Sequence, residues 1–214
     1  TAIVVLAGLI NAMKVVHKKL SGCKVATVGA GAAGTAITKL LRLYGVREII
    51  AVDSRGIIGD ARTDLNSEKK ALLEFVDRDK TGTMEDAIAG ADIFIGVSKG
   101  GLLTQAHIQS MAANPIVFAL ANPIPEIMPD QAKHAGVTVI ATGRSDFPNQ
   151  VNNSLAFPGI FRGALDNGVQ KITDQHKIAA AEALAALVDN PTADQVIPSP
   201  FDERVVPAVS AVIK

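Results

Sequence analysis

The run Lys24-Val-Ala-Thr-Val-Gly-Ala-Gly-Ala-Ala-Gly34 decides the fold of this 214-residue chain. The β-branched segment Lys24–Val28 leads into three glycines spaced G-x-G-x-x-G, and Thr35–Tyr44 then carries apolar side chains at helical spacing. A second apolar run, Glu48–Val52, follows and ends at Asp53. We therefore predict a strand, a glycine loop, a helix and a second strand, which together form a βαβ unit of about 30 residues.

Each glycine of this loop has a separate role if the unit binds a dinucleotide. Gly29 permits a tight turn, Gly31 lets a pyrophosphate approach the backbone, and Gly34 lets the helix pack close to the strand. The helix that begins there, at Ala32 and Ala33, presents free N–H groups to the phosphates. A turn that merely needs glycines is the alternative, but the flanking strands, the helix and the following acid favour dinucleotide binding.

The acid at the end of the second strand bears on which cofactor is bound. Asp53 lies 19 residues after Gly34, where a carboxylate accepts hydrogen bonds from the adenosine ribose and repels a 2′-phosphate. This favours NAD. The neighbouring Ser54 and Arg55 could instead hold a 2′-phosphate, so NADP stays an alternative. Arg55 could equally lie in solvent.

The rest of the chain alternates strands and helices, and its strands are continuous apolar runs, which is typical of a parallel sheet covered on both faces. We predict further strands at Ile93–Val97, Ile116–Leu120 and Val137–Ala141, and helices at Thr1–Lys19, Ser67–Val76, Met84–Ala89, Thr104–Met111 and Pro129–Ala135. Beyond Pro158 we expect only helices and one loop: Gly159–Asn167, Thr173–Val188, the loop Asp189–Pro200, and Asp202–Ile213.

These elements predict one α/β domain over residues 1–214, a Rossmann-like doubly wound parallel sheet with helices on both faces and additional C-terminal helices. The parallel strands should be ordered 3-2-1-4-5 or close to it. The first helix should lie outside the βαβ repeat and pack against the C-terminal helices.

Composition excludes several classes of function. With 48% hydrophobic and 20% charged residues, the chain should bury a core. Basic and acidic residues number 21 each, so no global charge favours nucleic acid or an anionic membrane. The apolar N-terminal run ends at Lys14, short of the roughly 20 residues of a transmembrane helix. Cys23 is the only cysteine, which excludes an internal disulfide and indicates a reducing, cytoplasmic location.

The chain resembles the malic enzymes in four segments. Thr1-Ala-Ile-Val-Val-Leu-Ala-Gly-Leu-Ile-Asn-Ala12 is similar to the helix that follows a metal-binding aspartate in that family, and the glycine loop with Asp53 is the second segment. Phe118-Ala-Leu-Ala-Asn-Pro123 resembles the family's strand ending in Ser/Ala-Asn-Pro. Gln150-Val-Asn-Asn-Ser-Leu-Ala-Phe-Pro-Gly159 resembles its Asn-Asn…Phe-Pro-Gly segment. The resemblance extends from Thr1 to the C-terminus.

The resemblance implies an oxidoreductase that oxidises malate with NAD(P) and Mg²⁺ or Mn²⁺ and decarboxylates the oxaloacetate to pyruvate and CO2. It implies that Asn122 and Asn153 bind substrate, and that Thr1, Asn122 and Asn152 contact the cofactor. An amide can donate to a carboxylate and accept from a hydroxyl without adding charge beside a hydride acceptor. Without the resemblance, Asn122-Pro123 indicates a turn and Asn152-Asn153 a helix cap.

One further strand end provides two more candidate cofactor contacts. Gly96-Val-Ser98 ends a predicted strand, so Val97 and Ser98 should lie near the cofactor at the carboxyl edge of the sheet. Lys99 is given no catalytic role, because the neighbouring Gly100-Gly101 indicates an exposed turn. The four histidines are scattered on predicted helices without metal-ligand spacing. We therefore assign no catalytic and no metal-binding residue to this chain.

The resemblance also implies an N-terminal half outside this sequence. In the family that half carries an acid–base tyrosine and lysine and the metal-binding acids, so we expect this chain to bind cofactor without turning over malate alone. A homodimer is expected for the intact enzyme. Three alternatives stay open: a stand-alone NAD-binding regulatory module, the cofactor domain of an amino-acid or shikimate-type dehydrogenase, and a paralogue that decarboxylates oxaloacetate.

Overall fold

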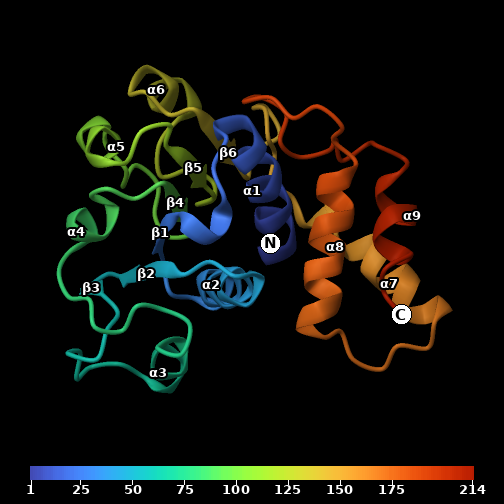
Figure 1. The fold of residues 1–214 in the computed structure, drawn as a ribbon, viewed down its shortest axis with the longest axis horizontal. Coiled ribbons are helices and arrows are strands. Elements are labelled where there is room, and N and C mark those ends of the chain that lie inside the picture. The colour runs from blue at the N-terminus through green and yellow to red at the C-terminus, as the bar shows by residue number, and fades with distance from the viewer.

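The computed structural model describes residues 1–214 and contains one six-stranded sheet with helices on both faces (Figure 1). The strand order is β3-β2-β1-β4-β5-β6, in which β3 pairs antiparallel with β2 and the other pairs are parallel. The strands are β1 (Lys24–Val28), β2 (Glu48–Asp53), β3 (Gly56–Ile57), β4 (Ile93–Gly96), β5 (Ile116–Ala119) and β6 (Val139–Thr142).

The helices precede, connect and follow these strands. They are α1 (Ala2–Val16), α2 (Ala32–Tyr44), α3 (Ser67–Leu72), α4 (Met84–Ile88), α5 (Gln105–Ser110), α6 (Pro129–His134), α7 (Phe157–Asp166), α8 (Asp174–Ala186) and α9 (Val205–Ser210). Two short 3-10 turns, η1 (Leu20–Gly22) and η2 (Asn153–Leu155), complete the regular structure.

Successive residues of a strand point to opposite faces of the sheet, and this builds two separate apolar cores. In β4, Ile93 and Ile95 belong to the larger core, which also contains side chains of α1, α2 and α8. Phe94 belongs to the smaller core with side chains of α4, α5 and α6. In β5, Phe118 belongs to the larger core and Val117 to the smaller one. Both faces of the central strands are buried, which explains their uninterrupted hydrophobic sequence.

Helix α1 lies between the sheet and α8, outside the βαβ repeat, as predicted (Figure 1). Gly8 leaves room for Phe118 of β5, because a Cβ on Gly8 would come within 2.9 Å of the ring. The buried amide of Asn11 donates to the carbonyl oxygens of Ala185 in α8, at 2.9 Å, and of Val196, at 3.1 Å. These bonds fix α1 to the C-terminal part of the chain.

The predicted fold class is confirmed, and every predicted strand is present within two residues at each end. The predicted strand order needs a correction. Of the five predicted strands, the third, Ile93–Val97, lies beside β1 and not beyond β2. The position beyond β2 is taken by β3, whose two residues are too few to form a recognisable apolar run. The last predicted helix, Asp202–Ile213, is shorter than expected, since α9 spans Val205–Ser210.

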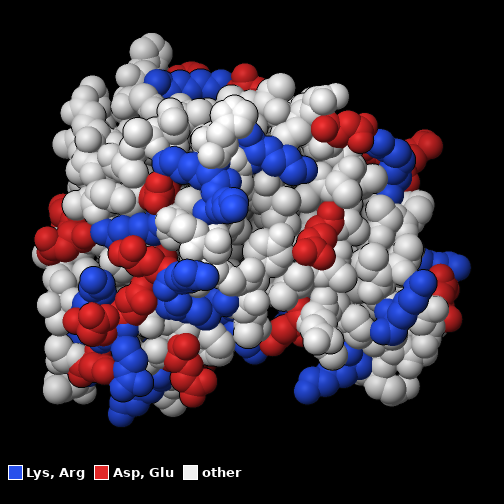
Figure 2. All heavy atoms as spheres, viewed as in Figure 1, with Lys and Arg blue, Asp and Glu red and all other residues white.

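Charged side chains of both signs are intermixed on the face seen in Figure 2, and they gather most densely over β3 and α3. The formal net charge of the chain is zero. None of the helices combines the length and the apolar character that crossing a membrane requires. The face seen in Figure 2 therefore carries local charge clusters and no single dominant sign.

Replacing Asn11 with alanine should destabilise the fold. The buried carbonyl oxygen of Val196 would lose its donor, and that of Ala185 would keep only the bond from the Val188 N–H at 3.2 Å, so we expect the free energy of unfolding to fall by about 1–3 kcal/mol. Urea denaturation measures this. Asn190→Ala, at an exposed position without a side-chain hydrogen bond, is the control and should change it by less than about 0.5 kcal/mol. Similar losses in both variants would contradict the role given to Asn11.

Candidate functional site

The glycine loop lies at the carboxyl edge of the sheet, where β1 ends and α2 begins. Gly29 has φ +110°, and its N–H donates to the carbonyl oxygen of Val52 in β2 at 2.9 Å. A Cβ on Gly34 would overlap the carbonyl oxygen of Gly29, so α2 can approach β1 this closely only with glycine there. Gly31 has no atom within 4 Å of its Cβ position, which leaves open space above the N-terminus of α2. The turn at Gly29 and the close packing at Gly34 are as the spacing predicted, and the approach of a pyrophosphate to Gly31 stays a prediction.

Asp53, at the end of β2, is held by a network that the sequence did not indicate. Its side chain is only 6% exposed. Oδ1 accepts from the backbone N–H of Arg55 at 2.8 Å and from Nη1 of Arg62 at 3.1 Å. Oδ2 accepts from Nη2 of Arg62 at 3.2 Å and from Nζ of Lys69 at 2.6 Å. Because a carboxylate offers about four acceptor positions, all of them are engaged in this structure.

The surroundings of Asp53 are more basic than the sequence near it suggests. Burial alone would raise the pKa of Asp53, but hydrogen bonds from Arg62, Lys69 and the Arg55 N–H outweigh burial and lower it. Asp64 also pairs with Arg55 and Arg62, so three cations face two carboxylates. One excess positive charge therefore lies beside the predicted ribose position. Ser54 is exposed at the same corner.

The loop after β4, which carries Val97 and Ser98, contacts the glycine loop. The N–H of Val97 donates to the carbonyl oxygen of Val28, the last residue of β1, at 2.9 Å. The Cβ position of Gly29 lies 2.8 Å from the Val97 oxygen and 3.2 Å from Cβ of Ser98. The ends of β1 and β4 thus form one continuous backbone surface beside the N-terminus of α2.

Asn122 follows β5 at the same edge and is exposed. It lines a polar cavity of about 320 Å³, and its peptide bond to Pro123 is cis. Gln150 lines this cavity and also an adjoining one of about 610 Å³, which Asn152 lines. Gln150 and Arg144, which also lines the first cavity, were not singled out from the sequence. The structure places Asn122 and Asn152 on neighbouring cavities that share Gln150.

The two adjacent asparagines after β6 have different local roles. Oδ1 of Asn152 accepts from the backbone N–H of Ser154 at 3.0 Å and so caps η2, which is the capping role expected without the family resemblance. Asn153 is exposed, and its Oδ1 accepts from the Thr1 hydroxyl at 2.8 Å. The structure thus joins Thr1 to Asn153 although 152 positions separate them in the sequence.

Neither a metal centre nor a reactive thiol is present among these residues. No group of three or more His, Cys, Asp or Glu side chains is placed to hold a metal ion, so the chain's own residues do not fit one. Cys23 is buried, and burial raises the pKa of its thiol to about 11. Such a thiol stays protonated and unreactive at neutral pH.

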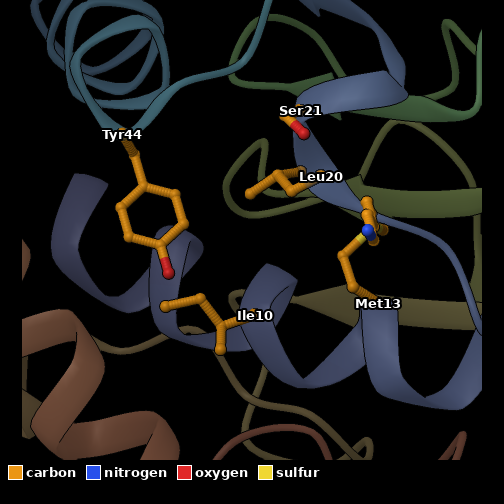
Figure 3. A pocket seen from close by; sticks show the side chains of 6 residues that line it. Ile10, Met13, Leu20, Ser21 and Tyr44 are labelled. Carbon is orange, nitrogen blue, oxygen red and sulfur yellow. The ribbon is translucent and has the colours of Figure 1, made fainter.

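One further cavity lies at the opposite edge of the sheet. It has a volume of about 390 Å³ and lies between α1, η1 and α2. Figure 3 shows the Tyr44 ring reaching across it toward Ile10, with Leu20 and Ser21 on the other side. Ser21 lies in η1, shortly before β1 begins at Lys24, so this cavity faces the amino ends of the strands. It does not belong to the candidate site.

A doubly wound sheet whose glycine loop leads into a helix, with an acid at the end of the next strand, defines a dinucleotide-binding domain of the Rossmann type. Residues 1–212 match the family described as the NAD-binding domain of malic enzymes. The chain belongs to that family.

Named relatives support the assignment and show its extent. The chain is 56% identical to the bifunctional malic/malolactic enzyme of Bacillus subtilis, over 100% of this chain and 53% of the relative. It is 44% identical to the NADP-dependent malic enzyme of Halomonas elongata, over 100% of this chain and 54% of the relative. The crystal structure of the NAD-dependent malic enzyme of Thermotoga maritima superposes with a TM-score of 0.94 at 43% identity, over 100% of this chain and 57% of that one. The chain therefore spans about half the length of these relatives.

Two glycines of the loop should respond differently to the same substitution. Gly34→Ala should lower the free energy of unfolding by about 3 kcal/mol, because the new methyl group overlaps the Gly29 carbonyl. Gly31→Ala should cost about 1 kcal/mol or less, because its methyl group meets open space and only a helix-cap preference is lost. Thermal and urea denaturation of the two variants measure the difference. Equal destabilisation would contradict the close approach of α2 to β1.

Proposed function

We propose that this chain is the cofactor-binding half of an enzyme that oxidises malate with NAD(P) and a divalent metal and decarboxylates the oxaloacetate to pyruvate and CO2. The observation that carries the proposal is the open space at Gly31 above the start of α2, beside the closely packed Gly34, in a chain of the malic-enzyme family. Backbone N–H groups at that helix start would hold the pyrophosphate. Malate and pyruvate are then the small-molecule partners.

We propose NAD as the preferred cofactor, with its adenosine ribose at Asp53. A ribose hydroxyl would have to replace one of the four donors now on that carboxylate, and Lys69 is the natural one because its side chain is partly exposed. NADP is the second candidate, favoured by the excess positive charge of Arg55, Arg62 and Lys69. A 2′-phosphate could pair with these cations but would meet the charge of Asp53.

We propose that the remaining chemical groups come from outside these residues. The metal, Mg²⁺ or Mn²⁺, and the acid–base residues would belong to the other half of the intact enzyme, which is expected to be a cytoplasmic homodimer. On this chain, Asn122 and Asn153 would bind the substrate, while Asn122, Asn152 and Thr1 would contact the cofactor with the glycine loop. The exposure of Asn122 and Asn153 at the carboxyl edge supports these roles.

Asp53→Ala should change the affinities for NAD and NADP in different ways. NAD loses a charge-assisted hydrogen bond worth about 1.5–3 kcal/mol, so its affinity should fall at least about tenfold. NADP affinity should hold or improve, because Arg62 and Lys69 lose a competing carboxylate. Calorimetric titration of the chain with each cofactor measures both. Asp166→Ala, which breaks a surface ion pair on α7, is the control and should change neither. Equal loss for both cofactors would exclude Asp53 as the ribose ligand.

The chain alone should bind NAD without oxidising malate, whereas the longer natural polypeptide should do both in the presence of Mn²⁺. In that polypeptide, Asn153→Ala should lower malate turnover at least about tenfold while leaving NAD affinity nearly unchanged, because its amide would act on the substrate. Steady-state assays and NAD titration test this, with Asn190→Ala as the control. Malate oxidation by residues 1–214 alone would refute the division of roles. Cofactor binding without activity in the longer protein would favour a regulatory module.

A further inference from the structure

Glu126 is a fully buried carboxylate, and it is not among the site residues predicted from the sequence. It lies in the segment between β5 and α6. Its Oε1 accepts from the backbone N–H of Ser98 at 3.0 Å, and its Oε2 accepts from the backbone N–H of Ala121 at 3.0 Å. Ser98 belongs to the loop after β4, and Ala121 immediately precedes Asn122 in the loop after β5. One carboxylate therefore bridges the two loops that carry these candidate site residues.

The backbone around Glu126 strengthens the same connection. Its carbonyl oxygen accepts from the N–H of Leu103 at 2.9 Å, and the carbonyl oxygen of Pro125 accepts from the N–H of Gly101 at 3.0 Å. A Cβ on Gly96, the last residue of β4, would overlap the Glu126 carboxyl group. The strand thus ends in glycine where the carboxylate needs the space. Four hydrogen bonds in all tie the loop after β5 either to the loop after β4 or to its own start.

The carboxylate has no cation to offset its burial. None of its hydrogen bonds or ion pairs involves a lysine, arginine or histidine side chain. Burial raises the pKa of Glu126, and hydrogen bonds from backbone N–H groups, including those of Ser98 and Ala121, oppose the rise. Burying a charge with only backbone donors is unfavourable compared with an apolar side chain of similar size. Holding the two loops at a fixed separation would offset that cost in free energy.

We propose that Glu126 is a positioning residue that sets the separation of the loops after β4 and β5. It thereby shapes the binding surface for the nicotinamide half of the cofactor. This rests on the proposed binding of NAD(P) at the glycine loop. In a doubly wound sheet the dinucleotide crosses the point where strand order reverses, which here lies between β1 and β4. The adenosine half lies toward Asp53, so the nicotinamide half lies over β4 and β5.

The test compares NAD with ADP, which carries only the adenosine half, on the chain itself. In Glu126→Gln the amide nitrogen must face one of the two N–H donors, so the loops lose one of their bridging bonds. We expect NAD affinity to fall about tenfold and ADP affinity to stay within about twofold of the unmodified chain. Calorimetric titration measures both ligands.

Asp92→Asn is the matched control. Asp92 is a carboxylate immediately before β4, at the opposite edge of the sheet, where it accepts from the backbone N–H of Lys24 in β1 at 2.9 Å and from Lys18 Nζ at 2.6 Å. This variant should lose stability while keeping its affinity for both ligands. Unchanged NAD affinity in Glu126→Gln, or an equal loss of NAD and ADP, would overturn the positioning role. Failure of the unmodified chain to bind either ligand would instead refute the proposed cofactor site.

A measurement on the unmodified chain covers the case in which Glu126→Gln does not fold. Amide hydrogen exchange at Ser98 and Ala121 should be slow, although Ser98 is exposed, because both N–H groups donate to the buried carboxylate. In Glu126→Asp, which keeps the charge but is one methylene shorter, exchange at one or both should accelerate and NAD affinity should fall selectively. Fast exchange at these positions in the unmodified chain would overturn the proposal.

Discussion

The candidate site depends on the absence of a side chain at Gly34. A Cβ at this position would overlap the Gly29 carbonyl oxygen. Because Gly34 has none, α2 can begin directly above the end of β1. This close approach brings the free N–H groups of the helix start to the carboxyl edge of the sheet, where β2 and β4 also end. It also leaves Gly31 facing open space. The proposed phosphate-binding surface, made from backbone alone, thus follows from one steric constraint.

Carboxylates fix the backbone at both edges of this sheet, but with different partners. At the amino edge, Asp92 accepts from the N–H of Lys24 and pairs with Lys18, and Asp77 accepts from the N–H of Ile49 at 2.7 Å. Asp77 also lies 3.5 Å from Arg42. At the carboxyl edge, Glu126 bridges two loops without a cation. Between the ends of β4 and β5, a carboxylate bound only by N–H groups thus fixes the backbone without a lysine or arginine, whereas Asp53 at the end of β2 pairs with Arg62 and Lys69.

The sequence predicted the elements and the glycine loop well because both rest on local patterns. Continuous apolar runs follow from strands buried on both faces, and the G-x-G-x-x-G spacing follows from the sterics of one turn. The ion pairs of Asp53 could not be predicted, since Arg62 reaches it only because β3 folds the chain back along β2. Glu126 gave no signal either: its partners are backbone N–H groups in separate loops, which leave no periodicity in the sequence.

The same geometry explains why this half of the enzyme would be insufficient for the reaction. Hydride transfer requires the substrate carbon to lie about 3–3.5 Å from the nicotinamide in an aligned orientation. In the proposed site the cofactor would lie along the glycine loop and the loops bridged by Glu126. This edge is a single surface, and Asn122 and Asn153 are exposed on it. Exposed amides in water bind a small dicarboxylate weakly, because water competes for every hydrogen bond. Under the proposed function, a second surface that excludes water and adds the metal would turn the same amides into orienting contacts. The proposed division of the site between two halves would then couple domain closure to reaction.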